Sequence, residues 1–365
     1  TFRDLQASDE RVQAHIDGLV VGGSAAWDLL QEGFGSDIAG EEFLAAVVAL
    51  DGGSKQARGV LRDVLLAAKE PRAPLIHALG LTLAADADSF LDELGRGAQP
   101  ALTAMLLDAM TLRGRTVPDL RTLLEHEDLS IVSVALRTTV SSRAEAAVPL
   151  VKNLAGRIGP HRNDALVTLA AFDPSLARRQ ARERFRAGDT DAALAQVLAL
   201  TGDAGDTEIV SEMAGSAESA LARAGVAALG TLGDPAGVRM LLRSLESADQ
   251  ADMASVSLRR IFGAALPWDD LLASSENVAD EDGQASPEAP VLDAKAVAAW
   301  WSRESKRFPA GTRLRSGEPF APRAPRPETP LAFRAEEIFE YVTADRARRW
   351  LDTRDWASRQ VSQLG

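Results

Sequence analysis

The sequence contains no cysteine in 365 residues, and aromatic residues make up only 5% of it. The absence of cysteine excludes a disulfide framework, a thiolate metal site and a cysteine nucleophile, and it suits a reducing compartment. No apolar run approaches the roughly 18–20 residues that a membrane-spanning helix needs. Thr1–Leu5 do not resemble a signal peptide. We therefore expect a cytoplasmic protein that does not engage a membrane, and, since the chain does not begin with Met, a longer natural N-terminus.

The motifs that usually mark an active site are also missing. There is no His-Glu-x-x-His, no Gly-x-x-x-x-Gly-Lys-Ser/Thr and no Gly-x-Ser-x-Gly. The four histidines do not pair at the spacing of metal ligands on a helix; they are His15, His77, His126 and His161. The sequence therefore predicts neither a metal nor a cofactor, and it favours a protein that is not an enzyme.

The charge balance is strongly acidic, with a formal net charge of −13. Such a charge opposes long-range attraction to nucleic acid. The hydrophobic fraction of 46% is that of a folded protein and excludes global disorder. The length is too great for one ordinary core, so it indicates either two domains or an elongated array.

One segment, residues 221–245, has the pattern of two helices joined by a tight turn. Gly233 lets the chain leave the first helix, Asp234 suits an N-cap and Pro235 suits the first helical position. An apolar face then follows at the spacing i, i+3, i+4, i+7; its residues are Val238, Leu241, Leu242 and Leu245.

The same pattern recurs along the chain with a nearly constant period. Apolar residues that open each second helix fall at Val60, Phe90, Leu120, Val151, Ala181, Val210, Leu241 and Leu271, with successive gaps of 30, 30, 31, 30, 29, 31 and 30 residues. This regularity predicts an all-α protein in which residues 41–273 form about eight helical hairpins stacked into an α-solenoid. Close packing of such hairpins by Ala, Leu and Val also explains the scarcity of aromatic residues.

The ends differ from the repeats. Residues 1–40 are expected to form a helical cap, and residues 274–292 an acidic linker. Residues 293–365 are expected to form a small helical module with a proline-rich arm. Four of the six tryptophans lie in this module and are expected to pack it onto the end of the solenoid; they are Trp300, Trp301, Trp350 and Trp356.

The segment Ala-Ala-Leu-Gly-x-Leu-Gly-Asp-Pro within residues 221–245 resembles the short HEAT-like repeats of phycobilisome lyases. The whole chain resembles a bacterial family of HEAT-like proteins in three places: residues 9–19 with Trp27, residues 300–313, and Arg359-Gln360. Some members of that family are encoded near type VI secretion genes. The resemblance implies a secretion-associated accessory, chaperone or immunity protein.

Candidate partner-binding residues come mainly from one basic helix, where the pattern favours contact with an acidic protein surface; they are Arg178, Arg179, Arg182 and Arg186. Arg313 and Arg315, in the irregular arm, are the next candidates, and Trp301 is a candidate recognition residue. The alternative interpretations are a solvated helix face for the arginines and core packing for the tryptophan.

Together these features predict a protein–protein interaction scaffold or adaptor, because stacked hairpins present a long groove in which many weak contacts add up. Two alternatives stay open. The first is a nucleic-acid-binding protein similar to the HEAT-like DNA glycosylases, which needs the basic residues on one face with an aromatic side chain and an acid. The second is an enzyme similar to the bilin lyases, which needs a deep pocket with converging polar groups.

Overall fold

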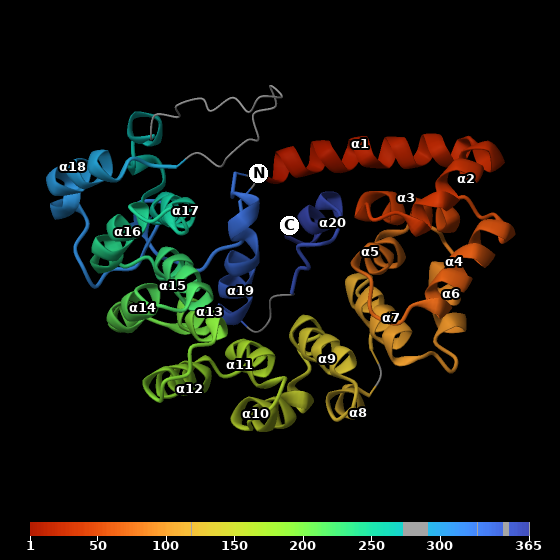
Figure 1. The fold of residues 1–365 in the computed structure, drawn as a ribbon, viewed down its shortest axis with the longest axis horizontal. Coiled ribbons are helices and arrows are strands. Elements are labelled where there is room, and N and C mark those ends of the chain that lie inside the picture. Colours follow the sequence, from red (N-terminus) through yellow and green to blue (C-terminus); the bar gives the residue numbers. More distant parts are fainter. Residues whose placement is uncertain (118, 273–290, 327, 346–349, 365) are drawn as a thin grey trace. The chain divides into compact units, whose positions relative to one another are not determined.

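The computed structural model describes residues 1–117, 119–272, 291–326, 328–345 and 350–364, and Figure 1 shows its helices in chain order. Twenty α-helices account for most of these residues. The only strands in this described part are the two-residue β1 (Leu314–Arg315) and β2 (Glu318–Pro319), which pair antiparallel. The prediction of an all-α fold is therefore confirmed.

Consecutive helices form pairs at the predicted period. The first seven pairs are α3 (Ala39–Asp51) with α4 (Lys55–Ala67), α5 (Ala73–Leu81) with α6 (Ala87–Leu94), α7 (Pro100–Leu112) with α8 (Leu120–Leu124), α9 (Leu129–Ser141) with α10 (Val148–Gly156), α11 (Arg162–Ala170) with α12 (Pro174–Arg186), α13 (Ala192–Thr201) with α14 (Thr207–Ala214), and α15 (Ser219–Leu232) with α16 (Val238–Leu245). In the eighth, α17 (Ala251–Phe262) is followed by only a short 3₁₀ helix, η6 (Trp268–Leu271). The eighth unit is thus shorter than the pattern predicts.

Aspartate caps explain why many of these helices begin where they do. The Asp128 side chain accepts from the backbone of Ser130 at the start of α9, and Asp173 caps α12 in the same way. Asp234 accepts from Ala236 at the start of η4 (Pro235–Gly237), which leads into α16. Each carboxylate satisfies an N–H group that has no partner within its helix.

The chain divides into two compact units. Unit 1 contains residues 1–168 and 323–365, and unit 2 contains residues 169–322, so the division falls within α11. The residues expected to form one C-terminal module are thereby shared between the units: α18 (Ala294–Glu304) belongs to unit 2, whereas α19 (Arg334–Ala344) and α20 (Ala357–Leu364) belong to unit 1. Apart from its last two residues, the expected acidic linker lies outside the described residues.

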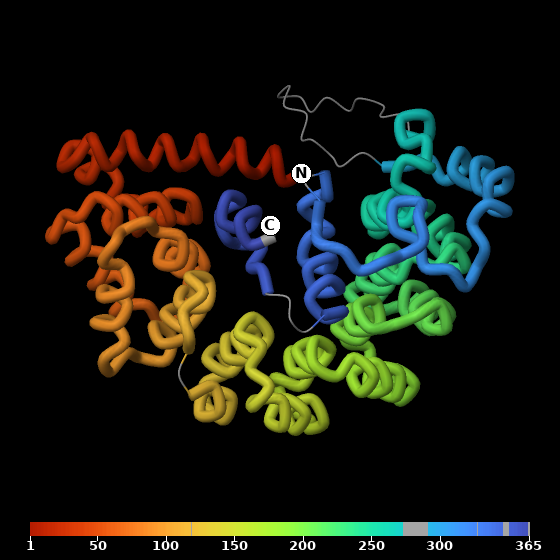
Figure 2. The backbone as a smooth tube through the Cα atoms, turned by 180° about the vertical axis from the view of Figure 1, so that it is seen from behind, coloured from red at the N-terminus to blue at the C-terminus, as the bar shows by residue number. Residues whose placement is uncertain are grey.

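In unit 1, the first helices of successive pairs pack side by side, from α3 through α5 and α7 to α9. Helices α1 (Phe2–Val21) and α2 (Gly23–Leu30), with η1 (Gln31–Gly35), pack against α3. The C-terminal helix α20 lies beside α1, as Figures 1 and 2 both show. The Asp9 carboxylate accepts a hydrogen bond from the Ala357 backbone at 2.7 Å, and the Trp356 indole donates to the Leu81 carbonyl at 2.9 Å.

In unit 2, an irregular arm, residues 308–322, crosses the C-terminal ends of α15 and α17. The backbone of Leu314 donates to the Gly233 carbonyl at 2.8 Å, and the backbones of Ser316 and Gly317 donate to carbonyls of α17. Gly233 has a φ of +75°, and a Cβ at this position would lie 2.2 Å from the Leu314 carbonyl oxygen. Only glycine therefore permits the arm to approach so closely.

Candidate functional site

Two of the four candidate arginines on α12 bind a buried aspartate of the next helix pair. Asp206 is completely buried, and Arg178 lies 2.7 Å from one of its carboxylate oxygens. Arg182 donates to the other oxygen, and Arg178 also pairs with Asp203 at 2.6 Å. Arg178 and Arg182 thus join α12 to η3 (Ala204–Asp206). The sequence spacing placed them on one helix face but did not reveal this internal partner.

The other two candidates on α12, Arg179 and Arg186, are exposed. Arg179 makes a long pair with Glu183 on its own helix, at 4.0 Å, with both side chains 64% exposed. Such a pair contributes little to stability, because solvent screens it. Arg179 and Arg186 therefore fit the interpretation of a solvated helix face.

The two candidates in the arm serve to dock it. Arg313 donates to the Leu232 carbonyl at 2.8 Å and to the Gly202 carbonyl at 3.2 Å, and Arg315 donates to the Thr231 carbonyl at 3.1 Å. The carbonyls of Thr231 and Leu232 lie at the end of α15, where helix carbonyls lack partners and carry partial negative charge. Arg315 is buried, so it is not presented to a partner.

Trp301 belongs to an aromatic cluster on α18 and α17. Phe262 is fully buried and contacts Trp300 and Phe308 edge to face, with ring centroids 5.1 and 4.9 Å apart. Trp301 stacks on Phe308 at 6.3 Å with an interplanar angle of 17°. Unlike Trp300, Trp301 is only partly buried. Of the two adjacent tryptophans, Trp300 thus packs in the core, whereas Trp301 is partly presented at the surface.

A cavity of about 350 Å³ opens beside Trp301, and we call it the Trp301 cleft. Its walls come from η4, α16, α18, the 3₁₀ helix η7 (Ser305–Arg307) and the residues that follow it; they are Pro235, Ala236, Arg239, Trp301, Ser305, Lys306, Phe308, Pro309 and Ala310. Arg239 and Lys306 are exposed, and neither has an ion-pair partner among the described residues. The cleft therefore combines a stacked aromatic pair with two uncompensated positive charges.

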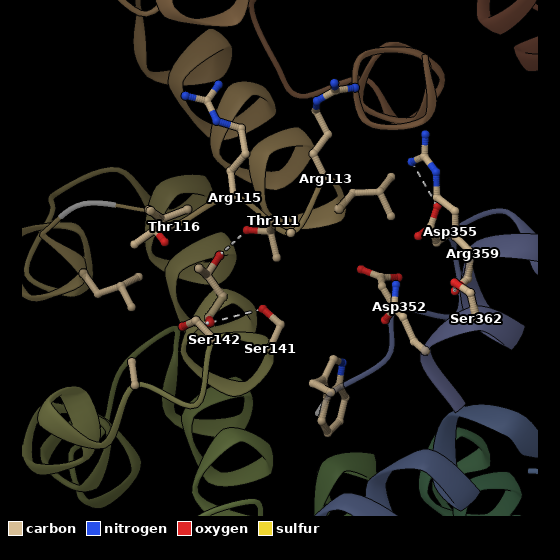
Figure 3. Close-up of a pocket in the computed structure, with 18 residues that line it drawn as sticks. Thr111, Arg113, Arg115, Thr116, Ser141, Ser142, Asp352, Asp355, Arg359 and Ser362 are labelled. Atoms are coloured by element: carbon tan, nitrogen blue, oxygen red, sulfur yellow. Dashed lines mark hydrogen bonds and ion pairs between the residues drawn. The ribbon is translucent and has the colours of Figure 1, made fainter. Parts of the chain in front are cut away.

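A larger cavity of about 720 Å³ lies within unit 1, between the α7–α8 turn, the end of α9 and the C-terminal segment, and Figure 3 shows it in close-up. We call it the hydroxyl pocket. Its walls are Thr111, Leu112, Arg113, Gly114, Arg115, Thr116, Val117, Leu120, Thr138, Ser141, Ser142, Ala144, Trp350, Asp352, Asp355, Arg359, Ser362 and Gln363.

The charged groups around the hydroxyl pocket are paired. Arg113 lies 2.7 Å from Asp88, and Arg115 lies 2.8 Å from Asp92, outside the pocket. Arg359 pairs with Asp355 at 3.3 Å. The remaining wall carboxylate, Asp352, pairs with Arg354, at 2.8 Å. The pocket is therefore polar without a large excess of charge.

Beside this pocket, Arg354 joins the C-terminal segment to α7. Its guanidinium donates to both oxygens of the buried Asp108, at 3.0 and 3.1 Å, and Arg137 of α9 donates to the same carboxylate at 3.0 Å. Burial acts to raise the pKa of the Asp108 carboxyl, but the hydrogen bonds and charges of Arg354 and Arg137 outweigh it and hold that pKa below its ordinary value. Asp108 is thus an ionised, buried anchor.

Within the described ranges, no group of three or more His, Asp and Glu side chains is placed to hold a metal ion. In the same part of the chain, no helix is long and apolar enough to cross a membrane. Comparison with known proteins finds no family model that matches the sequence, and no curated protein matches it either.

The sequence singled out Trp301 as a partner-binding candidate, but it did not single out the two cations beside it. Arg239 shares the short helix α16 with Arg243, and Lys306 sits among several basic residues that follow Trp301. The sequence does contain one signal for Arg239. It follows Asp234-Pro235 by about one turn of helix, so its side chain lies close to that helix start. Its proximity to α18 depends on tertiary packing, which spacing does not give.

Proposed function

We propose that the protein is a non-enzymatic interaction scaffold or adaptor, and that it captures an acidic, partly apolar segment of a protein partner in the Trp301 cleft. The observation that carries this proposal is the stacked Trp301–Phe308 pair flanked by Arg239 and Lys306, both exposed and without an ion-pair partner in the described ranges. Aromatic and arginine side chains dominate the binding energy of protein interfaces.

The contrast with the rest of the chain supports this choice. The chain carries a net charge of −13, and several of its arginines are engaged internally, as Arg178 and Arg182 are with Asp206. The Trp301 cleft is a local exception to this acidic charge balance, because it places two uncompensated cations beside a partly exposed aromatic side chain. Since the overall charge repels an acidic partner at long range, the cleft itself must supply the attraction at contact.

The nucleic-acid alternative has less support. It depends on two basic runs of the sequence, one on α12 and one in residues 303–326. On α12, Arg178 and Arg182 are held by Asp206. In the second run, Arg313 and Arg315 donate to backbone carbonyls of the same unit. A protein partner in a reducing cytoplasm, in a secretion-associated role, remains the stronger proposal. The absence of cysteine suits that setting.

The test is affinity purification of the tagged full-length chain from its native host, with mass spectrometry and a nuclease-treated parallel. We expect one protein to be recovered stoichiometrically, insensitive to nuclease, and to be lost with Trp301→Ala and with the double variant Arg239→Glu/Lys306→Glu. Arg179→Glu, an exposed charge reversal on α12, is the matched control and should retain the partner. Equal recovery with all variants, or recovery that depends on nucleic acid, would refute the proposal.

A further inference from the structure

The hydroxyl pocket of unit 1 presents hydrogen-bond acceptors rather than donors along one wall. The side chains of Ser141 and Ser142 both donate to the Thr138 carbonyl, at 3.1 and 2.6 Å. Because each hydroxyl has one proton and that proton is used, its lone pairs are what remain for a ligand. Thr111 and Thr138 share a further hydrogen bond of 2.8 Å on the same wall.

The opposite wall adds carboxylates. Figure 3 shows Asp352 across the pocket from Ser141 and Thr111, with Asp355, Arg359 and Ser362 beside it. The Ser362 hydroxyl donates to the Arg359 carbonyl at 2.8 Å, so it too offers lone pairs. A ligand that fills this space must bring several donors of its own.

The charges of this wall and of the residues directly beside it cancel locally, which selects against a strongly charged ligand. Asp352, Asp355 and Asp108 are matched by Arg354, Arg359 and Arg137 through ion pairs of 2.8–3.3 Å; the pairs are Asp352–Arg354, Asp355–Arg359, Asp108–Arg354 and Asp108–Arg137. A cation would meet the guanidinium of Arg359 at the pocket wall. A neutral ligand with hydroxyl groups avoids that repulsion and can also accept from Arg359.

An anion is disfavoured by the direction of the other two guanidinium groups. Figure 3 shows Arg113 and Arg115 extending away from the hydroxyls of Thr111, Ser141 and Ser142. Their partners, Asp88 and Asp92, lie outside the pocket walls. The two arginines therefore contribute their stems to the wall while their charges are neutralised elsewhere.

The pocket also has an apolar side, formed by Trp350 together with Leu112, Val117, Leu120 and Ala144. Trp350 is partly exposed and meets Phe339 edge to face at 6.2 Å. A pocket that joins an aromatic side chain to many acceptors matches a ligand with an apolar C–H face and a rim of hydroxyl groups. Its volume of about 720 Å³ lies within the range of small-ligand sites.

We propose that the hydroxyl pocket binds a neutral saccharide, with Trp350 against the sugar ring and Asp352, Ser141 and Ser142 accepting from its hydroxyl groups. This site is separate from the Trp301 cleft and does not depend on the proposed protein partner.

The experiment is ligand-observed saturation-transfer NMR on the full chain, with maltotriose and chitotriose as neutral probes and spermidine and inorganic pyrophosphate as charged ones. We expect transfer to at least one neutral trisaccharide. Asp352→Asn replaces an acceptor with a donor and should weaken that binding about 10-fold, the effect of losing one hydrogen bond to a charged group. Ser141→Ala/Ser142→Ala should weaken it also, whereas Trp301→Ala in unit 2 should leave it unchanged.

Trp350→Ala tests the stacking contact, and because it also removes a partner of Phe339, its helical circular dichroism is compared with that of the wild type. If it does not fold, Asp352→Asn and the serine double variant still decide the question. Absence of transfer to both trisaccharides, equal transfer in the pocket variants, or binding of spermidine or pyrophosphate instead of the neutral probes would overturn the proposal.

Discussion

Arg182 on α12 donates a hydrogen bond to Asp206, a carboxylate that the protein buries completely. Arg178 approaches the same carboxylate from one turn earlier on the helix. A charge that is deeply buried must be compensated, since its transfer from water is costly. These arginines therefore hold one helix pair to the next.

This relationship predicts that α12 charge reversals separate into two classes. Arg182→Glu places a second carboxylate beside Asp206 and should lower the free energy of unfolding by about 3 kcal/mol or more. Arg179→Glu, on the exposed side of the same helix, should change it by less than about 0.5 kcal/mol. Urea titration followed by circular dichroism measures both, and equal losses would contradict the structural role of Arg182.

The Asp108 anchor gives a second stability prediction. Asp108→Asn leaves Arg354 and Arg137 without their shared counter-charge and should destabilise unit 1 by about 3 kcal/mol. Asp86→Asn removes an ion pair with Arg58 in which the carboxylate is 59% exposed, and should cost less than about 1 kcal/mol. Urea unfolding measures both losses. Equal losses in the two variants would contradict the prediction that Asp108 is a buried anchor.

The pKa of Asp108 gives a prediction about acid. Because its folded-state pKa lies below the ordinary value of about 3.9, Asp108 binds a proton more readily in the unfolded chain. Its contribution to stability is therefore complete above that ordinary value and is lost as the pH falls through the folded-state pKa. The difference in unfolding free energy between the wild type and Asp108→Asn should shrink as the pH is lowered from about 5 toward acid. A difference that grows on acidification would show that the pKa is raised instead.

The arm can dock at Gly233 because glycine has no Cβ. Gly233→Ala should cost the roughly 1–2 kcal/mol of a left-handed alanine and, because its Cβ would meet Leu314, a further cost of about 1–3 kcal/mol. Gly188 lies in the same unit with a φ of +88°, and a Cβ added there would meet no atom within 4 Å. Gly188→Ala should therefore show the backbone cost alone. Thermal unfolding of both variants tests the difference, which disappears if the arm does not dock at Gly233.

The sequence predicts the repeated part of the fold well because its signals are local. The Asp234-Pro235 start and the apolar spacing that ends at Leu245 both act within a few residues, and the period of about 30 residues follows from their repetition. The eighth pair ends in the short η6, even though Leu271 keeps the period and is buried. Periodicity indicates that a residue is buried, but it does not determine the length of the helix that contains the residue.

The candidate site could be predicted only in part. Trp301 is partly exposed beside a cleft, whereas Arg315 is buried against the Thr231 carbonyl. Both residues lie in the same stretch of sequence, and composition does not distinguish them. Their different roles follow from partners that lie far away in the chain, which no local pattern reports.

The hydrogen bond between Asp9 and the backbone of Ala357 spans 348 positions of the chain. During synthesis, α1 leaves the ribosome long before its neighbour α20 exists, whereas unit 2 is one uninterrupted stretch of sequence. Unit 2 can therefore complete its contacts while unit 1 still waits for Arg354 and Trp356. The half of the protein that is made first is finished last, and until then the Leu81 carbonyl and the buried Asp108 side chain lack the partners that the C-terminal segment supplies.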